Sequence, residues 1–240
     1  MKILAFDSTA VTASVAVAED EKLLAEITLN NGNTHSETLL PMAEALFRML
    51  SITADDIDLF AASSGPGSFT GVRIGAATLK GMAFGRNKPC VGVSTLEALA
   101  YNLRSHKGII CPVMNARRSQ VYTAIFESDG ERLVRLTDDM AIAADELDLK
   151  LSGYAVPVYL CGDGIEVALE CFKQTKAIAA NENERYQSGY SVSQVALSLY
   201  KEGKYTSDAE LTATYLRLSQ AERERLERKT NKFKNKGTII

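Results

Sequence analysis

The sequence contains no tryptophan and only two histidines among its 240 residues. Neither His35 nor His106 belongs to an HxxxH or HExxH pattern, and the four cysteines form no CxxC pair. These absences argue against a zinc or iron site, because such sites are built from clustered histidine and cysteine ligands. No GxSxG elbow is present either, so the sequence offers no recognisable nucleophile–base arrangement for a hydrolase.

Long apolar runs are missing as well. No stretch approaches the roughly 18 apolar residues of a membrane span, and the first apolar run, residues 3–6, is too short for a signal peptide. Three of the four cysteines lie in or beside strand-like apolar runs, so we expect reduced core residues at Cys90, Cys111, Cys161 and Cys171. The sequence therefore predicts a soluble cytoplasmic protein.

A strong excess of one charge is also absent, since the formal net charge is -3 and 46% of the residues are hydrophobic. This composition excludes a disordered chain and a simple coiled coil. The charge is uneven, because residues 219–240 hold seven lysines and arginines against three glutamates, and the rest of the chain carries -7. Such a basic tail, from Arg223 to Lys236, is either a solvated terminal helix or a contact for RNA or an acidic partner.

Hydrophobic periodicity predicts two lobes made of strand–loop–helix units. In the first lobe, residues 1–105, three strands form an antiparallel meander, and strands and helices alternate after it. Thr34 with Glu37, and Ser94 with Glu97, have the spacing of a capping box at two helix starts. The elements expected in this lobe are strands at 3–6, 12–18, 23–29, 57–62 and 90–93 and helices at about 35–50, 72–84 and 94–103.

That order of elements gives an α/β lobe with a mixed sheet and helices on its faces, an arrangement of the RNase-H type. A second lobe is expected over residues 106–210, and residues 211–240 are expected to return to the first lobe. Asp129-Gly130 predicts a hairpin turn in the second lobe. Its expected elements are strands at 109–114, 119–126, 132–136 and 157–161 and helices at about 165–172 and 192–200.

The most distinctive segment is Gly65-Pro66-Gly67-Ser68-Phe69-Thr70-Gly71, between a predicted strand and a predicted helix. Backbone N–H groups and the helix dipole at such a place favour an anion, and the hydroxyls of Ser68 and Thr70 add donors. The stretch is neither a Walker loop nor a Rossmann fingerprint. On spacing alone, a tight turn that packs the helix closely on the sheet is the simpler interpretation.

Two acidic turns form a second candidate site. Asp7-Ser8-Thr9 follows the first strand, and Gly162-Asp163-Gly164 takes a corresponding position in the second lobe. A carboxylate at either turn would lie beside a metal-bound phosphate, and two such turns facing across a cleft would describe a nucleotide site. Each turn alone is a weak signal, because Asp and Gly are ordinary turn residues.

Five segments, in order along nearly the whole chain, resemble the TsaB (YeaZ) family. They are Asp7-Ser8-Thr9, THSETLLP at 34–41, GPGSFTGVRIG at 65–75, NARRSQVY at 115–122 and YLR at 215–217. The stretch at 65–75 is the most specific of the five. The chain has Asn115 where the family usually has aspartate.

The resemblance implies an actin/Hsp70-like fold of two RNase-H-like lobes and a role in making threonylcarbamoyladenosine (t6A) in tRNA, beside the anticodon. It implies that the chain is the non-catalytic partner of TsaD, the paralogue that transfers the threonylcarbamoyl group, with the ATPase TsaE as a third member. Isolated members of the family form homodimers. No cofactor is expected to bind tightly, ATP or ADP is expected only at the partner interface, and the complex is expected to contact tRNA, with the basic tail as a candidate contact.

Two departures from active relatives support the non-catalytic role. TsaD-like proteins hold a metal through an HxxxH pair, and its positions fall on Thr95 and Leu99 here, neither of which has an imidazole. Actin-like ATPases favour glycine in the first phosphate loop where this chain has Ser8, whose Cβ would crowd a phosphate.

The resemblance also assigns a partner surface to the helices at about 35–50 and 71–84. Small residues there would allow another chain to approach closely, and apolar residues would be buried against it. The residues expected on this surface are His35, Thr38, Leu39, Met42, Leu46, Gly71, Gly75, Thr78, Leu79 and Met82. We expect Gly75→Leu to disrupt dimer and heterodimer while leaving the monomer folded.

Two alternative functions remain open at this point. An autonomous actin-fold ATPase or sugar kinase would use Asp7, the loop at 65–71 and Asp163 as its phosphate residues, and tight binding of Mg-ATP would favour it. An M22-like peptidase is the third reading, although the sequence supplies neither a nucleophile–base pair nor a metal site for it.

Overall fold

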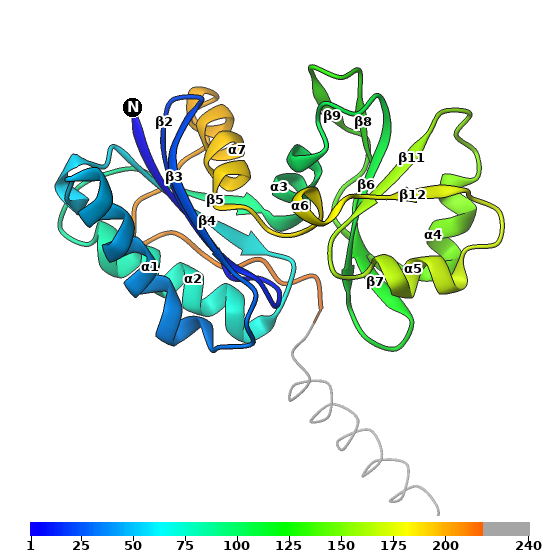
Figure 1. Cartoon of the computed structure of the whole chain (residues 1–240), viewed down its shortest axis with the longest axis horizontal. Helices are drawn as coiled ribbons and strands as arrows, with labels where there is room; N and C mark the ends of the chain where they lie inside the picture. The colour runs from blue at the N-terminus through cyan, green and yellow to red at the C-terminus, as the bar shows by residue number, and fades with distance from the viewer. Residues whose placement is uncertain (218–240) are drawn as a thin grey trace, which may run out of the picture.

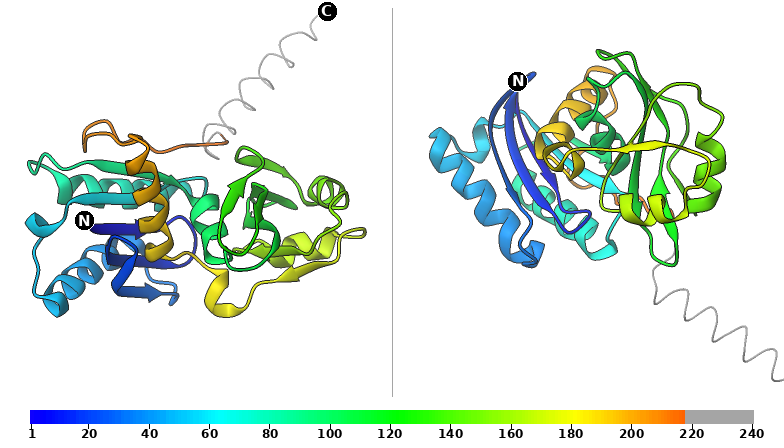
Figure 2. Two further views of the ribbon diagram at one scale, coloured as in Figure 1. Left: turned by 90° about the horizontal axis from the view of Figure 1, so that it is seen from above. Right: turned by 45° about the vertical axis from the view of Figure 1, so that its right-hand side comes forward.

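The computed structural model describes residues 1–217, which form two lobes beside each other (Figures 1 and 2). The basic tail from Arg223 to Lys236 lies outside the described residues. Within them, no helix is both long enough and apolar enough to cross a membrane. The predicted fold class, an α/β actin/Hsp70-like architecture with a mixed sheet in each lobe, is confirmed by the order and direction of the strands.

The first lobe is built on a five-stranded sheet in the order β3-β2-β1-β4-β5. β1, β2 and β3 pair antiparallel, whereas β4 and β5 continue the sheet in parallel with β1. β1 and β4 are buried along almost their whole length, as expected for central strands with both faces covered. The strands are β1 (Lys2–Asp7), β2 (Ala13–Glu19), β3 (Lys22–Leu29), β4 (Leu59–Gly65) and β5 (Cys90–Ser94).

Two pairs of helices cover the two faces of this sheet. α1 (His35–Leu50) and α2 (Phe69–Ala83) lie together on one face, where Phe6, Phe60 and Leu79 pack among their apolar side chains. α3 (Thr95–Asn102) and α7 (Gly189–Lys201) cover the other face (Figure 1). A short 3-10 turn, η1 (Ala54–Asp56), leads from α1 into β4.

The second lobe repeats this plan with smaller helices. Its sheet follows the path β10-β7-β6-β11-β12, and β8 and β9 are added beside β6. The strands are β6 (Gly108–Asn115), β7 (Gln120–Thr123), β8 (Phe126–Ser128), β9 (Leu133–Arg135), β10 (Met140–Ala143), β11 (Val158–Cys161) and β12 (Ala177–Ala179). The helices are α4 (Ala144–Leu151), α5 (Ile165–Cys171) and α6 (Glu182–Arg185). Each strand on the path has a counterpart in the first sheet, so the lobes are two copies of one topology.

The lobe boundary near residue 106 agrees with the start of β6, but the predicted end of the second lobe at 210 is wrong. α7 packs on β1 and β2 of the first sheet, and Gly189 approaches the backbone of β2 closely. Val192 and Val195 belong to the core between this helix and the sheet. The chain therefore returns to the first lobe at about residue 189, because α7 supplies the apolar face that covers β1 and β4.

Several local predictions also differ from the structure. The run at 119–126 is two strands, β7 and β8, which pair with different parts of β6. Thr34 stands at the N-cap position of α1, but its side chain makes no capping hydrogen bond. The hydroxyl of Ser94 accepts a hydrogen bond from the backbone amide of Glu97, as predicted. The four cysteines are free thiols, of which the three at 90, 111 and 161 are buried and the fourth, at 171, is partly exposed.

Candidate functional site

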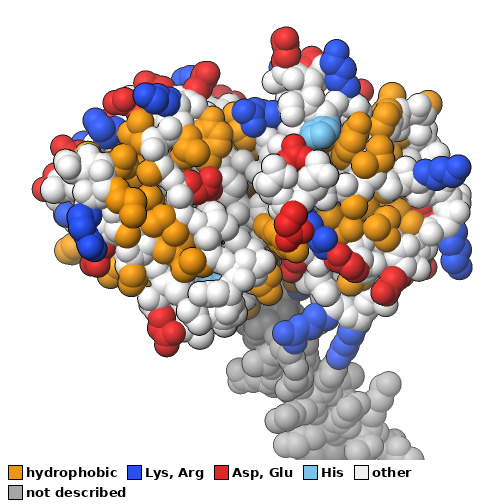
Figure 3. Space-filling model, in the orientation of Figure 1, with side chains coloured by type: hydrophobic (Ala, Val, Ile, Leu, Met, Phe, Trp, Pro, Cys, Tyr) orange, Lys and Arg blue, Asp and Glu red, His pale blue; other side chains and the backbone are white. Residues whose placement is uncertain are grey.

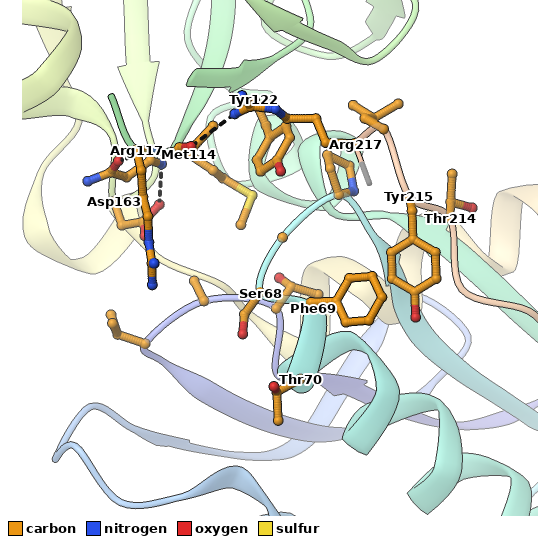
Figure 4. A pocket seen from close by; sticks show the side chains of 18 residues that line it. Ser68, Phe69, Thr70, Met114, Arg117, Tyr122, Asp163, Thr214, Tyr215 and Arg217 are labelled. Atoms are coloured by element: carbon orange, nitrogen blue, oxygen red, sulfur yellow. Dashed lines mark hydrogen bonds between the residues drawn. The ribbon is translucent and has the colours of Figure 1, made fainter. Parts of the chain in front are cut away.

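A cleft of about 620 Å³ opens between the lobes. Its walls are the β1–β2 turn, the glycine-rich loop with the first turn of α2, the β6–β7 turn and the C-terminal segment 214–217 (Figure 4). The predicted phosphate residues that line it are Thr9, Gly67, Ser68, Thr70 and Asp163. Those that do not line it are Asp7, Ser8, Gly65 and Gly162.

Behind this cleft, the glycine-rich loop is closed against the β1–β2 turn. The Ser68 amide donates to the Thr9 carbonyl at 2.6 Å, and the Ser8 hydroxyl donates to the Gly71 carbonyl at 2.8 Å. A Cβ at Gly71 would collide with the Ser8 carbonyl oxygen, and one at Gly75 would lie 2.6 Å from Ser8 Oγ. The glycines therefore let two protein segments touch, and the contact leaves no room for a phosphate between them.

Asp7 is sealed into this contact and is only 1% exposed. Its carboxylate accepts from Ser63 Oγ at 2.5 Å and from the amide and hydroxyl of Thr9 at 2.9 and 2.7 Å. Burial raises the pKa of Asp7 above its usual value, against the hydrogen bonds from Ser63 and Thr9, which lower it. Asp7 thus shapes the β1–β2 turn, and it is placed away from the cleft.

Asn115, rather than Asp163, is the counterpart of Asp7 in the second lobe. β6 ends at Asn115 as β1 ends at Asp7, whereas Asp163 follows β11, the counterpart of β4. The predicted correspondence between the two acidic turns is therefore wrong. The Asn115 amide donates to Asp163 Oδ1 at 3.2 Å, and its side-chain oxygen accepts from the Arg117 amide at 2.8 Å. Burial raises the pKa of Asp163.

The described part of the C-terminal segment lies against the first lobe. Leu211 is buried in the core beneath α1 and α2, and the Thr214 amide donates to the Ser64 carbonyl at 2.7 Å. Beside them, a Cβ at Gly65 would meet the Thr214 carbonyl oxygen. These contacts fix the segment along the end of β4, so that the residues following it reach the cleft.

The next residues form an aromatic and cationic cluster at the mouth of the cleft (Figure 4). The ring of Tyr215 stacks on Phe69 with centroids 4.3 Å apart, and the guanidinium of Arg73 lies 4.0 Å from the Phe69 centroid. Arg73 Nε also donates to the Tyr215 hydroxyl at 2.9 Å. Arg217 Nη1 crosses to the second lobe and donates to the Ala116 carbonyl at 3.0 Å.

Sequence reasoning did not assign a role to this cluster. The signal was present, since YLR at 215–217 and NARRSQVY at 115–122 are two of the five segments that carry the family resemblance. Their positions are separated by about 100 residues, however, and only the fold brings them to the same cleft.

His35 and Thr38 are engaged within the first turns of α1. His35 Nε2 donates to the Ala10 carbonyl at 2.7 Å, which places the proton on that nitrogen, because a carbonyl only accepts. Its Nδ1 is buried and has no hydrogen-bond partner among the described residues. The Thr38 hydroxyl donates to the Thr34 carbonyl at 3.3 Å. His35 therefore ties α1 to the β1–β2 turn.

Most residues predicted for the partner surface are instead buried in their own lobe. Half-buried positions are His35, Thr38, Thr78 and Met82. Fully buried ones are Leu39, Met42, Leu46, Gly71, Gly75 and Leu79. The effect of Gly75→Leu on the fold of the monomer stays a prediction, and a Cβ there would lie 2.6 Å from Ser8 Oγ, so the substitution would disturb a contact within the monomer as well. The pattern misleads because the most regular apolar stripe of a helix faces its own sheet.

The outward side of α1 and α2 carries a different set of residues. Leu40, Met49 and Phe84 are exposed at 46%, 72% and 77%. Gly81 is exposed on α2, and a Cβ added there would meet no atom within 4 Å among the described residues. Hydrophobic side chains form a band on this lobe in Figure 3. By the α1–α2 outer face we mean these four exposed residues, which belong to α1 or to the C-terminal end of α2 and lie outside the core.

No cluster of three or more histidine, cysteine, aspartate or glutamate residues suitable for a metal ion occurs within residues 1–217. Thr95 and Leu99 are both buried at the start of α3. The Thr95 hydroxyl has no hydrogen-bond partner among the described residues. Both side chains are therefore part of the protein interior. The Thr95 hydroxyl is the one side-chain oxygen of this pair that could bind a metal.

Comparisons with known proteins agree with this architecture. A family described as "TsaD: tRNA N6-adenosine threonylcarbamoyltransferase" matches residues 22–222. The tRNA threonylcarbamoyladenosine biosynthesis protein TsaB of Bacillus subtilis is 30% identical over 92% of this chain and 96% of its own length. The chain belongs to the TsaB (YeaZ) family.

Further relatives extend the same result. TsaB of Escherichia coli is 28% identical over 90% of this chain and 95% of its own length. The solved structure of YeaZ from Pseudomonas aeruginosa covers 90% of this chain and 99% of its own, with a TM-score of 0.79 and 22% identity, and so shares the fold. A tRNA N6-adenosine threonylcarbamoyltransferase of Kosmotoga olearia is 28% identical over 65% of this chain and 54% of its own length. The TsaB family and the transferases are thus related in sequence.

Proposed function

We propose that this chain is the non-catalytic partner of a TsaD transferase in the formation of t6A in tRNA. The observation that carries the proposal is the α1–α2 outer face, which combines exposed apolar side chains with a helical glycine that the monomer itself does not require. Glycine inside a helix costs about 1 kcal/mol relative to alanine. Close approach of a helix from another chain would explain why glycine, rather than alanine, stands at position 81.

The sequence relationship between the two families favours TsaD as the protein that binds this face. TsaD proteins are similar in sequence to this chain, so their own α1 and α2 equivalents offer a related pair of helices. Related surfaces pair readily about a pseudo-twofold axis, as identical ones do in symmetric dimers. The same face would form the homodimer when the partner is absent, with Leu40, Met49 and Phe84 buried in either assembly.

The cleft supports a role without catalysis. Behind it, Ser8 is in contact with Gly71, and the Asp7 carboxylate accepts hydrogen bonds from Thr9 and Ser63. An actin-fold ATPase or kinase would need both places for phosphate and metal. TsaE as the ATPase of the complex, and ATP or ADP held at the interface with TsaD rather than inside this chain, complete the proposed assembly.

The test is threonylcarbamoyl transfer to tRNA, reconstituted from one organism's components, with this chain present, omitted, or substituted at the outer face. We expect no t6A without the chain. Met49→Asp combined with Gly81→Arg should leave the fold intact and weaken TsaD binding at least tenfold. Leu149→Asp is the matched control, because Leu149 is 61% exposed on α4, the second-lobe counterpart of α1.

Transfer that proceeds fully without this chain would show that it is not a partner. Unchanged TsaD affinity in the Met49→Asp/Gly81→Arg variant would show that the docking face lies elsewhere. An equal loss in the Leu149→Asp control would attribute the effect to general surface charge.

A further inference from the structure

The arginines of this chain fall into two groups. Arg86, Arg135 and Arg185 form salt bridges, with Asp55, with Glu97 and Asp139, and with Glu166. Within residues 1–217, the other seven arginines have no carboxylate within salt-bridge distance, namely Arg48, Arg73, Arg104, Arg117, Arg118, Arg132 and Arg217. Three of these seven, Arg73, Arg117 and Arg217, lie at the mouth of the cleft or pack on residues that line it.

These cations come from three separate segments around the cleft. Arg117 comes from the β6–β7 turn, Arg217 from the C-terminal segment and Arg73 from α2. The bond from Arg217 to the Ala116 carbonyl holds its guanidinium beside the turn that carries Arg117 (Figure 4). Asp163 is the one acidic residue among the described residues that line the cleft, against Arg117 and Arg217, so an anion at the rim would balance the remaining positive charge.

The β6–β7 turn adds an independent sign of a ligand. Arg117, Arg118 and Ser119 all have positive φ, at 65°, 55° and 53°, a region that residues other than glycine rarely adopt. Asn115 supports the turn by accepting from the Arg117 amide. Strained backbone that projects two exposed arginines is typical of a binding site, since a relaxed hairpin would suffice for the fold alone.

The shape of the cleft decides what kind of anion fits. The contact of Ser8 with Gly71 lies behind the cleft and leaves no room for a phosphate between those two segments. The arginines stand at the rim, and Tyr215, 41% exposed, offers a ring face next to them. A polymer lying across the mouth satisfies both features, because its phosphates meet the guanidinium groups while a base stacks on the tyrosine.

The sequence that follows this rim is also positively charged. Arg217 is directly followed by the segment whose residues 219–240 carry a net charge of +4. The fixed cations of the rim and the basic sequence attached to it are therefore contiguous along the chain. Clustered cationic residues favour a polyanion, and RNA is the polyanion that the proposed function includes.

We propose that the mouth of the interlobe cleft binds the backbone of an RNA segment, with Arg117, Arg118 and Arg217 contacting phosphates and Tyr215 stacking on a base. This inference rests on the proposed function, in which the RNA is the tRNA that the complex modifies. It adds that this chain takes part in holding the substrate, besides docking the transferase.

The test measures binding of a fluorescently labelled tRNA anticodon stem-loop to the full-length chain, alone and in complex with TsaD, over a series of KCl concentrations. In Arg117→Gln/Arg118→Gln/Arg217→Gln, we expect affinity to fall at least tenfold at 100 mM KCl. The slope of log K against log salt should become shallower by about 2, since each single-strand phosphate contact contributes roughly 0.7. Arg132→Gln is the matched control, because Arg132 is exposed on the β8–β9 turn and lies outside the cleft lining.

Equal losses in the triple variant and the Arg132→Gln control, or no loss in either, would overturn the proposal. ATP that competes with the RNA at this rim with micromolar affinity would also overturn it, since it would identify a small-nucleotide site instead. Arg217→Lys, which keeps the charge, should retain RNA binding and shows that loss of the Ala116 bond is not the cause. The RNA measurement on the chain alone does not depend on transferase activity, so its failure and the failure of the partner role are distinguished.

Discussion

Two glycines on the same helix should respond in opposite ways to the same substitution. Gly71 and Gly81 both lie in α2, and alanine is the better helix former at either position by about 1 kcal/mol. At Gly81 an added Cβ meets no atom within 4 Å among the described residues. At Gly71 it would collide with the carbonyl oxygen of Ser8, which belongs to backbone and cannot rotate away.

The expected magnitudes follow from these surroundings. Gly81→Ala gains the helix propensity alone, so its free energy of unfolding should rise by about 1 kcal/mol. Gly71→Ala gains the same amount but forces the β1–β2 turn to move, at about 1–3 kcal/mol for overpacking. It also loses the bond from the Ser8 hydroxyl to the Gly71 carbonyl, worth about 1 kcal/mol. The net destabilisation is therefore about 1–3 kcal/mol.

Urea denaturation followed by circular dichroism, together with thermal melting, measures both changes. For a chain of this size each kcal/mol shifts Tm by about 2–4 °C, so the two variants should differ by about 4–16 °C. Gly75→Ala, whose Cβ would lie 2.6 Å from the side-chain oxygen of Ser8, should fall between them, because Ser8 Oγ can rotate. Equal stability of Gly71→Ala and Gly81→Ala would refute the assignment of these glycines to packing and to the outer face.

Two buried carboxylates give predictions of opposite sign in pH. The Asp148 carboxylate accepts hydrogen bonds from the backbone amides of Lys173, Gln174 and Thr175 at 2.6, 2.9 and 2.8 Å. Burial acts to raise the pKa of Asp148, but these hydrogen bonds outweigh it and hold the pKa below 3.8. Asp148→Asn should therefore cost about 2 kcal/mol near pH 7, with the difference shrinking as pH falls below about 4, checked by urea midpoints across that range. Burial raises the pKa of Asp7 instead, so its stabilising form is the protonated one, present below pH 3.8 and lost as pH rises through the raised pKa. Relative to wild type, Asp7→Asn should gain stability between pH 4 and 7, and a difference independent of pH would contradict this reading.

The alternation of strands and helices was predictable because each central strand is an apolar run bounded by turns. Residues 3–6 and 57–62 were expected as strands, and β1 and β4 occupy these positions. Residues 137–156 gave no such pattern, since β10 is half-buried along its length and α4 is short and acidic at its start. β12 has only three residues, two of them exposed, so its pairing with β11 decides its structure rather than its own sequence.

The candidate site was only partly predictable, for a reason that Leu39 and Leu40 illustrate. Both are apolar and adjacent on α1, yet Leu39 is 1% exposed and Leu40 is 46% exposed. Hydrophobic periodicity identifies one apolar stripe on each helix, and that stripe packs against the sheet of its own lobe. The apolar residues that stay exposed are those off the stripe, and only the packing shows which they are.

Glycine spacing was ambiguous in the same way, because close approach to a ligand and close approach to a neighbouring segment require the same residue. The structure distinguishes these two possibilities by showing which residues lie opposite each loop. Ser8 and Thr9 stand opposite the glycine-rich loop of the first lobe, whereas the corresponding side of the second lobe presents the exposed Arg117 turn. The two copies of one topology have therefore diverged in opposite directions. The glycine-rich loop of the first lobe is in contact with the β1–β2 turn, whereas the β6–β7 turn of the second lobe is exposed and cationic at the cleft. The proposed docking residues and the proposed anion-binding residues do not overlap, so substitutions should abolish the two interactions separately.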